Sequence, residues 1–390
     1  MSSGITLSSA TRQNLLSLQD TASLTSTTQN RLATGLKVSS ALDSPVNFFT
    51  AQALSNRSAD LGGLLDSISN GVQVIQAANQ GITSIQKLID SAKSTANQAL
   101  STQVTTTGTA KDDFTAAAST VAFYVNGTAK STTLAATDDI DAAIGKLNTS
   151  AGSTMFSKDT TGKKIVLNAS ADVEFKDTAS QTALGFSAGS GTAPNYGTAN
   201  TTVAQAKELT VSGVDSRKKL AEQFNTLLTQ ITQLAKDSSF NGVNLISNGD
   251  PTNKLHIAFN EKDTANLDIQ GQDLTSDGLD LDAITAGTTG TGNFLLDADV
   301  KTTLLSLGAA SDTLRSASST FGSNLSVVQN RQDFTKRLVN ILDTGAANLT
   351  NADLNAEAAN SQALSTRQSL GISALSLANQ AQQGILQLLR

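Results

Sequence analysis

The sequence predicts a mainly helical α+β protein. In this fold, long antiparallel, coiled-coil-like helices from both termini are joined by a small β-rich outer insert and a β-hairpin. Apolar residues recur at alternating steps of three and four over long stretches near both ends, which is typical of helices that pack along a seam. The chain has only 3 Pro in 390 residues, so little interrupts such helices. Short stretches typical of strands lie only in the middle of the chain.

The N-terminal part contains the first of these stripes, between residues 61 and 99. Its candidate seam residues are Leu61, Leu65, Ile68, Val72 and Ile75. The step from Ile82 to Ile85 breaks the alternation, and we expect a local overwinding there and not the end of the helix. Further upstream, the same spacing links Leu15, Leu18, Leu32 and Leu36.

The C-terminal third contains a matching pair of stripes. The first has the candidate seam residues Leu325, Val328, Leu338 and Ile341. The second starts near Ala363, and its candidate residues are Leu364, Ile372, Leu375, Ile385, Leu388 and Leu389. Stripes at the two far ends can meet only if the chain folds back on itself.

Polar residues occupy several seam positions in the outermost segments, among them Thr25, Gln29 and Gln368. Polar residues at core positions lower the stability of a helix pair, and a helix without tertiary packing is marginal in water. We therefore expect these ends to become ordered only when they pack against other copies of the chain.

The middle of the chain predicts shorter elements. Strands are expected at residues 121–125, ending in the turn signal Asn126-Gly127, and at 164–167 and 173–176. A short helix is expected at 138–147, loops at 185–202 and 287–292, and a longer helix at 203–236. The alternating residues Leu255, Ile257 and Phe259 predict one strand of a hairpin, with its partner at Leu267 and Ile269.

Composition excludes several classes of function. The net charge of −6 gives no basic surface for nucleic acid or for an anionic membrane. With no Cys and one His, the chain lacks the residues of a common nucleophile, metal or acid–base site, so neither an enzyme nor a cofactor is expected. His256 is expected to be a solvent-facing strand residue. The first residues have neither the basic nor the apolar region of a signal peptide.

Four ordered motifs carry a family resemblance. Arg31-Leu-Ala-Thr-Gly-Leu-Lys-Val-Ser-Ser-Ala41 resembles the bacterial flagellin motif R-L-S-S-G-L-R-I-N-S-A, and Gly35 in it is expected to be a turn residue between two helical pieces. Phe240-Asn241-Gly242 with Leu245 resembles F-N-G-x-x-L. The segment 351–357 loosely matches D-A-D-x-A-x-E. The last thirteen residues resemble A-N-Q-x-P-Q-x-V-L-x-L-L-R. The resemblance covers residues 1–107 and 203–390.

The sequence departs from the family pattern in three places. The family's K-D-D-A-A-G is Leu42-Asp-Ser-Pro-Val-Asn47 here, and Pro45 suggests a sharper bend. The Pro of the last motif is Gln382. Residues 108–202 interrupt the helical region early, and residues 121–147 resemble the hook-type insert of some flagellins.

The resemblance implies a self-polymerising subunit of the extracellular flagellar filament, exported through the flagellar type III channel without a cleaved signal peptide. Residues 1–44 with 351–390 would form the inner tube, residues 45–107 with 203–350 the outer tube, and residues 108–202 a solvent-facing insert. Its partners would be other copies of the chain, an export chaperone, the filament cap and hook-associated proteins. The alternative is a hook–filament junction protein, which shares the end helices but does not grow into long filaments.

The resemblance also bears on recognition by animal Toll-like receptors. Residues 85–90, Ile-Gln-Lys-Leu-Ile-Asp, align with the family patch L-Q-R-V-R-E that these receptors sense. Ile89 stands at the second Arg position. Because Ile lacks the charge and the paired donors of Arg, weak recognition is expected.

Overall fold

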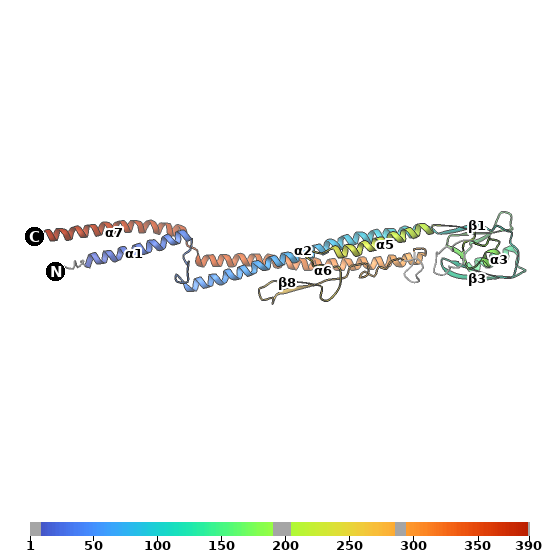
Figure 1. Cartoon of the computed structure of the whole chain (residues 1–390), viewed down its shortest axis with the longest axis horizontal. Coiled ribbons are helices and arrows are strands. Elements are labelled where there is room, and N and C mark those ends of the chain that lie inside the picture. Colours follow the sequence, from blue (N-terminus) through green and yellow to red (C-terminus); the bar gives the residue numbers. More distant parts are fainter. Residues whose placement is uncertain (1–8, 190–203, 285–293, 389–390) are drawn as a thin grey trace. The chain divides into compact units, whose positions relative to one another are not determined.

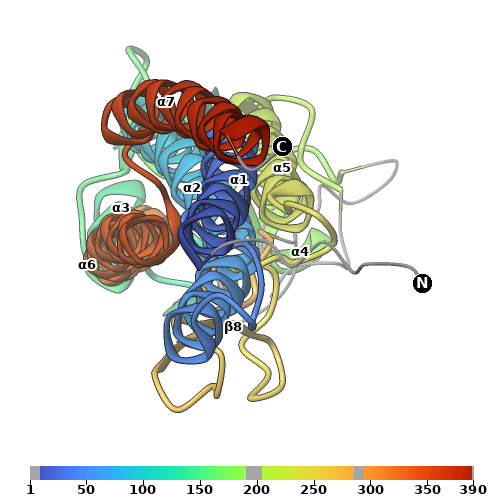
Figure 2. The same cartoon turned by 90° about the vertical axis from the view of Figure 1, so that its left-hand side faces the viewer.

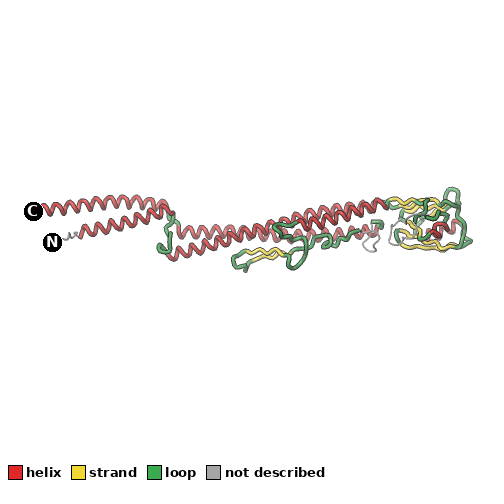
Figure 3. The backbone as a smooth tube through the Cα atoms, in the orientation of Figure 1, coloured by secondary structure: helices red, strands yellow, loops and turns green. Residues whose placement is uncertain are grey.

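The computed structural model describes residues 9–189, 204–284 and 294–388. Five helices account for most of it (Figures 1 and 3): α1 (Ser9–Thr34), α2 (Pro45–Ser101), α5 (Val214–Asp237), α6 (Asp297–Thr350) and α7 (Leu354–Leu388). The chain divides into two compact units. The first unit comprises residues 1–69, 258–266 and 330–390, and the second comprises residues 70–257 and 267–329. The predicted helical ends and β-containing middle are confirmed.

In the first unit, α1 and α7 lie side by side (Figures 1 and 2), and Figure 1 shows that they are antiparallel. Arg31 near the end of α1 contacts Glu357 near the start of α7. Leu18, in the middle of α1, packs against Gly371 further along α7. A short linker follows α1, and α2 then begins at Pro45. Proline is tolerated in the first turn of a helix because the N–H it lacks would have no partner there.

The second unit contains a three-helix core. Gln86 of α2 donates to the Ser311 hydroxyl of α6 at 2.7 Å. At every seventh position, α6 buries an apolar residue: Leu307, Leu314, Phe321 and Val328. Helix α5 runs antiparallel to α2, because Ser238 lies against Gly81 and Arg217 bonds to the Thr102 carbonyl. Helix α2 continues through Ile82 and Ile85, as expected.

Gly81 marks the closest approach of α2 to its neighbours. A Cβ atom there would lie 2.2 Å from the Ser238 hydroxyl oxygen and 2.7 Å from Ile246 Cδ1. Gly81→Ala should therefore destabilise the second unit by about 1–2 kcal/mol, because overpacking exceeds the gain in helix propensity. Thermal unfolding followed by far-UV circular dichroism measures this.

Gly322→Ala is the matched control, because Gly322 lies on α6 in the same unit and a Cβ atom added there would meet no neighbouring atom within 4 Å. This substitution should stabilise the chain by up to about 1 kcal/mol through helix propensity alone. Equal effects of the two substitutions would contradict the close packing at Gly81.

The prediction of a helix starting at residue 203 is wrong. Residues 204–213 are not helical, and α5 begins only at Val214. Gly213 before it has φ +89°, a conformation that favours glycine and interrupts any earlier helix. Ala206 and Leu209 instead pack into the core of the insert. These two apolar residues are therefore buried, but in the insert and not on one face of a helix.

The insert is built of two antiparallel sheets. One has the order β4-β5-β1-β7, from Phe156–Lys158, Ile165–Ala169, Thr105–Thr109 and Thr210–Ser212. The other has the order β3-β2-β6, from Thr128–Leu134, Ser119–Val125 and Val173–Phe175. Two helices complete it, α3 (Ile140–Ala151) and α4 (Thr178–Ala183). Since β1 and β7 belong to one sheet, the sheet extends beyond the expected bounds 108–202.

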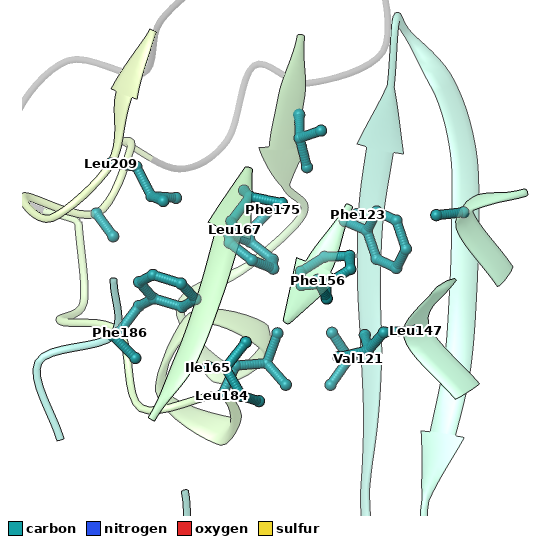
Figure 4. Close-up of a cluster of buried hydrophobic side chains, with 14 of the residues drawn as sticks. Val121, Phe123, Leu147, Phe156, Ile165, Leu167, Phe175, Leu184, Phe186 and Leu209 are labelled. Atoms are coloured by element: carbon teal, nitrogen blue, oxygen red, sulfur yellow. The ribbon is translucent and has the colours of Figure 1, made fainter. Parts of the chain in front are cut away.

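Aromatic side chains fill the core of the insert (Figure 4). Phe123 packs edge-on against Phe156 and Phe175, with ring centroids 5.7 and 6.5 Å apart. Phe175 in turn contacts Phe186. This core joins residues from both sheets and from α3, so the insert has a hydrophobic centre of its own.

The strands predicted at 121–125, 164–167 and 173–176 and the helix predicted at 138–147 are confirmed, with bounds that differ by at most four residues. Asn126 and Gly127 have φ values of +47° and +76°, as the Asn-Gly turn requires. Strands β1, β3, β4 and β7 were not predicted. The sequences of β1, β4 and β7, TTTGT, FSK and TVS, are too short or too polar to show alternation, and before β3 only the Asn-Gly turn signal was recognised. The loop predicted at 287–292 and most of that at 185–202 lie outside the described residues.

Asp172 is an ionisable group placed in the interior of the insert. It is 5% exposed, its Oδ1 has no hydrogen-bond partner among the described residues, and burial raises its pKa to about 6. A raised carboxyl pKa favours the folded state below the unfolded value of 3.8, and this contribution is lost as pH rises through about 6. Asp172→Asn should therefore stabilise the insert above pH 7 by up to about 3 kcal/mol, and by little near pH 4.

Asp159→Asn provides the control with the opposite sign. Hydrogen bonds from the Thr161 hydroxyl and from the Lys164 and Lys163 N–H groups lower the pKa of Asp159 to about 2. Its contribution is present above pH 3.8 and lost as pH falls through about 2. The substitution should therefore destabilise the insert at neutral pH. Tyrosine fluorescence during urea unfolding reports on this region, since the chain has no Trp and its two Tyr are Tyr124 and Tyr196.

The predicted hairpin is confirmed as β8 (Lys254–Ala258) paired with β9 (Asn266–Gln270). Ile257 and Ile269 are buried, and His256 faces solvent beside Asp268, with 2.5 Å between His256 Nδ1 and Asp268 Oδ1. His256 is thus the exposed strand residue that the alternation indicated. In the first unit, the Arg331 guanidinium lies over the Phe259 ring, 5.6 Å from its centroid.

Candidate functional site

The terminal helix pair of α1 and α7 is held at one end by charge. Arg31 Nη1 donates to Glu357 Oε1 at 3.0 Å, and the Glu357 side chain is more buried than that of Arg31. The Asp353 carboxylate accepts from the N–H groups of Asn355 and Ala356 and so caps the start of α7. These contacts fix the register of the two helices without burying apolar surface.

Backbone hydrogen bonds continue the pairing beyond Arg31. Gly35, at φ +70°, turns the chain out of α1, and its carbonyl accepts from Ala352 N–H at 2.8 Å. Leu36 forms an isolated antiparallel bridge with Asn351, and Lys37 N–H donates to the Thr350 carbonyl at 2.7 Å. The predicted turn at Gly35 is thus also a point where segments from both ends of the chain meet.

The helix pair itself buries almost no apolar side chain. Among the described residues of α1 and α7, the buried ones are Thr11, Thr21, Thr28 and Glu357. Large apolar side chains are instead exposed on both helices: Leu15, Leu16, Leu24, Leu354, Leu370, Ile372 and Leu377. A two-helix pair with such a contact has little to stabilise it as a monomer.

The predicted terminal residues fall into three groups. Half-buried between α1 and α7 or beside them are Leu18, Arg31, Leu32, Gly35, Leu36, Leu364 and Leu375. Leu15 and Ile372 are exposed. Ile385 and Leu388 belong to α7, but their side chains lie outside the described residues, as does all of Leu389. Whether these residues take part in polymerisation stays a prediction.

Most of the predicted seam residues of α2 and α6 point inward. Leu61, Ile68, Val72, Ile75 and Val328 are buried, and Leu65, Leu325 and Leu338 are half-buried. Ile341 was predicted to lie in the seam, but it is 66% exposed in this chain and its neighbour Leu342 is buried instead. The spacing of three from Leu338 to Ile341 does not predict the buried face here. At this end of α6 the buried residues are Thr335 and Leu342, which are seven positions apart.

The motif at residues 240–242 forms the expected tight turn. Phe240 and Val243 exchange backbone hydrogen bonds of 2.9 and 3.0 Å, and Asn241 and Gly242 take φ values of +50° and +79°. This is the geometry that Asn-Gly favours. The turn lies just after α5 and positions Leu245 and Ile246, which are buried in the second unit.

The described ranges contain no group of three or more His, Cys, Asp or Glu side chains that could hold a metal ion. No helix among them is both long and apolar enough to cross a membrane.

Two family models match the two ends of the chain. The bacterial flagellin N-terminal helical region matches residues 5–122, and the bacterial flagellin C-terminal helical region matches residues 304–389. The chain belongs to the bacterial flagellin family. The flagellin resemblance of the terminal motifs is thereby confirmed, and the two matched regions include the helix pairs described above.

Curated flagellins of several bacteria are similar to this flagellin chain. Flagellin FljM of Caulobacter vibrioides is 35% identical over 171 residues, which is 44% of this chain and 59% of the relative. Flagellin FljO of the same organism is 34% identical over the same shares. Flagellin C of Rhizobium meliloti is 28% identical over 218 residues, covering 45% of this chain and 68% of the relative. The chain thus spans about three fifths of the length of the first two relatives.

Two features of this flagellin were missed by sequence reasoning. Arg217 lies on the apolar face of α5, three residues after Val214 and seven before Phe224, and a charge at such a position signals a buried polar contact. Leu42 is exposed in the linker, where no periodicity places it. The sequence showed that residues 42–47 depart from the family pattern, but it did not show that Leu42 is exposed there.

Proposed function

We propose that the chain is a structural, non-enzymatic subunit that polymerises with other copies of itself into the flagellar filament outside the cell. The observation that carries this proposal is the terminal helix pair, which exposes large apolar side chains and buries none among its described residues. Full burial of one such side chain contributes about 1.5–3 kcal/mol. Seven of them give a strong driving force for packing against neighbouring copies.

The expected division of the filament follows from this proposal. Residues 1–44 with 351–390 would form the inner tube, and residues 45–107 with 203–350 the outer tube. The insert would face solvent, in keeping with its own hydrophobic core. Export through the type III channel, with a chaperone, the filament cap and hook-associated proteins as partners, is part of the same proposal.

Seeded assembly of the purified chain tests the proposal. Filament seeds or a precipitating salt are added to the monomer, growth is followed by electron microscopy, and helix content is followed by far-UV circular dichroism. Long hollow filaments with a gain of helix are expected, because a helix pair that buries so little apolar surface should become fully ordered only on packing against other copies. A chain that stays monomeric with full helix content would contradict the proposal and favour a junction protein.

Weak recognition by Toll-like receptors is a separate part of the proposal. Ile85 and Ile89 are fully buried in the second unit, and Gln86 is bonded to Ser311. At position 89 the chain therefore offers neither a charge nor an accessible side chain to a receptor. A receptor reporter assay should show weak activation by the monomer, and full activation would overturn this expectation.

A further inference from the structure

A rigid turn in the linker between α1 and α2 holds a leucine in solvent. The Asp43 carboxylate accepts from the N–H groups of Ser39 and Ser40, both at 2.9 Å, and from their hydroxyls. These bonds lower the pKa of Asp43 and keep it ionised. Leu42, one residue earlier, is 96% exposed. The turn therefore presents an apolar side chain in a fixed position.

The first turns of α2 extend this apolar surface. Val46 is 75% exposed and Phe49 63% exposed, and they follow Leu42 at steps of four and three. Leu42, Val46 and Phe49 are called the apolar corner below. In the folded chain, Phe48 contacts Phe49 edge-on with ring centroids 5.6 Å apart, but Phe48 is the more buried of the two. The start of α2 thus has an apolar residue on each of two faces.

The face of α2 that carries Phe48 lines a groove in the same unit, called the linker groove below. Its walls come from the linker, from α2 and from the end of α6, and they include Leu36, Val38, Phe48, Ala51, Ala346 and Ala347. The groove has a volume of about 290 Å³, enough for a large apolar side chain. Asp343 and several hydroxyl and amide groups complete its rim.

We propose that the apolar corner of one copy docks into the linker groove of a second copy. This inference rests on the proposed polymerisation and names one of its contacts. Phe48 and Phe49 are adjacent in a helix and face different ways, so the corner points away from the groove of its own chain. Each copy offers one corner and one groove, and such a heterologous contact can repeat from copy to copy, as an open helical filament requires.

Charge supports the same pairing. Asp43 stands beside Leu42 in the corner, and Lys37 stands between the groove residues Leu36 and Val38. The Lys37 ammonium donates to the Asn348 carbonyl at 3.1 Å, and neither Lys37 nor Asp43 forms an ion pair within the described part of the chain. Docking would bring the Asp43 carboxylate toward the Lys37 ammonium, which lies next to the groove residues Leu36 and Val38.

Disulfide trapping tests the contact directly, because the chain has no Cys of its own. Leu42→Cys and Ala347→Cys chains are mixed in equal amounts, assembled and oxidised. Covalent dimers containing one chain of each kind are expected in filaments and not in dilute monomer. The control pairs Leu42→Cys with Ala33→Cys, an exposed alanine of α1 in the same unit, and should give few dimers.

A size exchange provides the second measurement. Ala347→Leu should fill the groove, and Leu42→Ala should shorten the corner, so each should slow seeded growth at least several-fold. The combination of the two should restore much of the growth rate, since a filled groove then meets a shortened corner. Circular dichroism and unfolding of the monomers show whether either chain fails to fold.

The outcomes separate the inference from the function. If the wild-type chain forms filaments, then assembled Leu42→Cys and Ala347→Cys chains that give no mixed disulfides, or growth that is insensitive to both size substitutions, would overturn the docking contact and leave polymerisation standing. Failure of the wild-type chain to form filaments would overturn both. Mixed dimers together with rescue by the double variant would establish the contact.

Discussion

Removal of residues 366–390 should abolish filament growth and leave the rest of the chain folded. The deletion removes Leu370, Ile372 and Leu377, three of the exposed apolar residues of the terminal pair, together with Gly371, against which Leu18 packs. The second unit ends at residue 329 and loses nothing. Seeded growth should fall below detection, while tyrosine fluorescence and urea unfolding of the insert remain unchanged.

A control variant retains the length of α7. Ser369 and Ser373 lie in the deleted segment, and their hydroxyls bond only to carbonyls one turn earlier in the same helix. Replacing both by Ala should leave filament growth intact or slightly faster, because Ala favours helix. Normal filaments from the truncated chain would contradict the role given to the terminal pair.

Arg217→Ala should cause the largest loss of stability in the second unit. Arg217 is 4% exposed, and its guanidinium ties together three chain segments. Nε donates to the Thr102 carbonyl at 2.7 Å, Nη1 to the Leu295 carbonyl at 2.9 Å, and Nη2 to Asp297 Oδ1 at 2.7 Å. Removal leaves part-buried carbonyl oxygens without donors and leaves a cavity, which costs about 2–4 kcal/mol. Hydrogen exchange at the end of α2 and the start of α6 measures this.

Arg315→Ala is the matched control on α6 in the same unit. Arg315 also pairs with an aspartate, Asp312, but both side chains are largely exposed. Its removal should change stability by less than about 0.5 kcal/mol. Arg217→Lys should fall between the two, since one ammonium cannot serve the acceptors on both segments, at Thr102 and at residues 295–297. Equal effects of the two alanine substitutions would contradict the bridging role of Arg217.

The long helices were predictable from sequence because their signal is repeated many times. In α2, the buried residues Leu61, Ile68 and Ile75 recur at every seventh position, so a single polar residue such as Asn79 does not hide the pattern. The hairpin of β8 and β9 was predictable from the alternation at 255–259, and the end of β2 was predictable from the Asn-Gly turn at 126–127. In both cases the interactions that shape the element lie within a few residues in the sequence.

Other features depend on partners distant in sequence. Strand β1 exists because Thr106 pairs with Ala169 and Val211, and nothing in TTTGT indicates those partners. Ile341 has the spacing of a seam residue, but the packing at the end of α6 turns Leu342 inward instead. The linker groove could not be predicted at all, because it is formed by three segments that meet only in the folded chain.

The pairing of Gly35 and Leu36 with Asn351 and Ala352 has a consequence for the order of folding. These contacts join residues more than 300 positions apart, so their formation carries a high entropic cost of loop closure. A ribosome makes α1 first and α7 last. Throughout synthesis α1 therefore has no partner on its own chain, and its leucines remain available to whatever molecule binds a nascent helix.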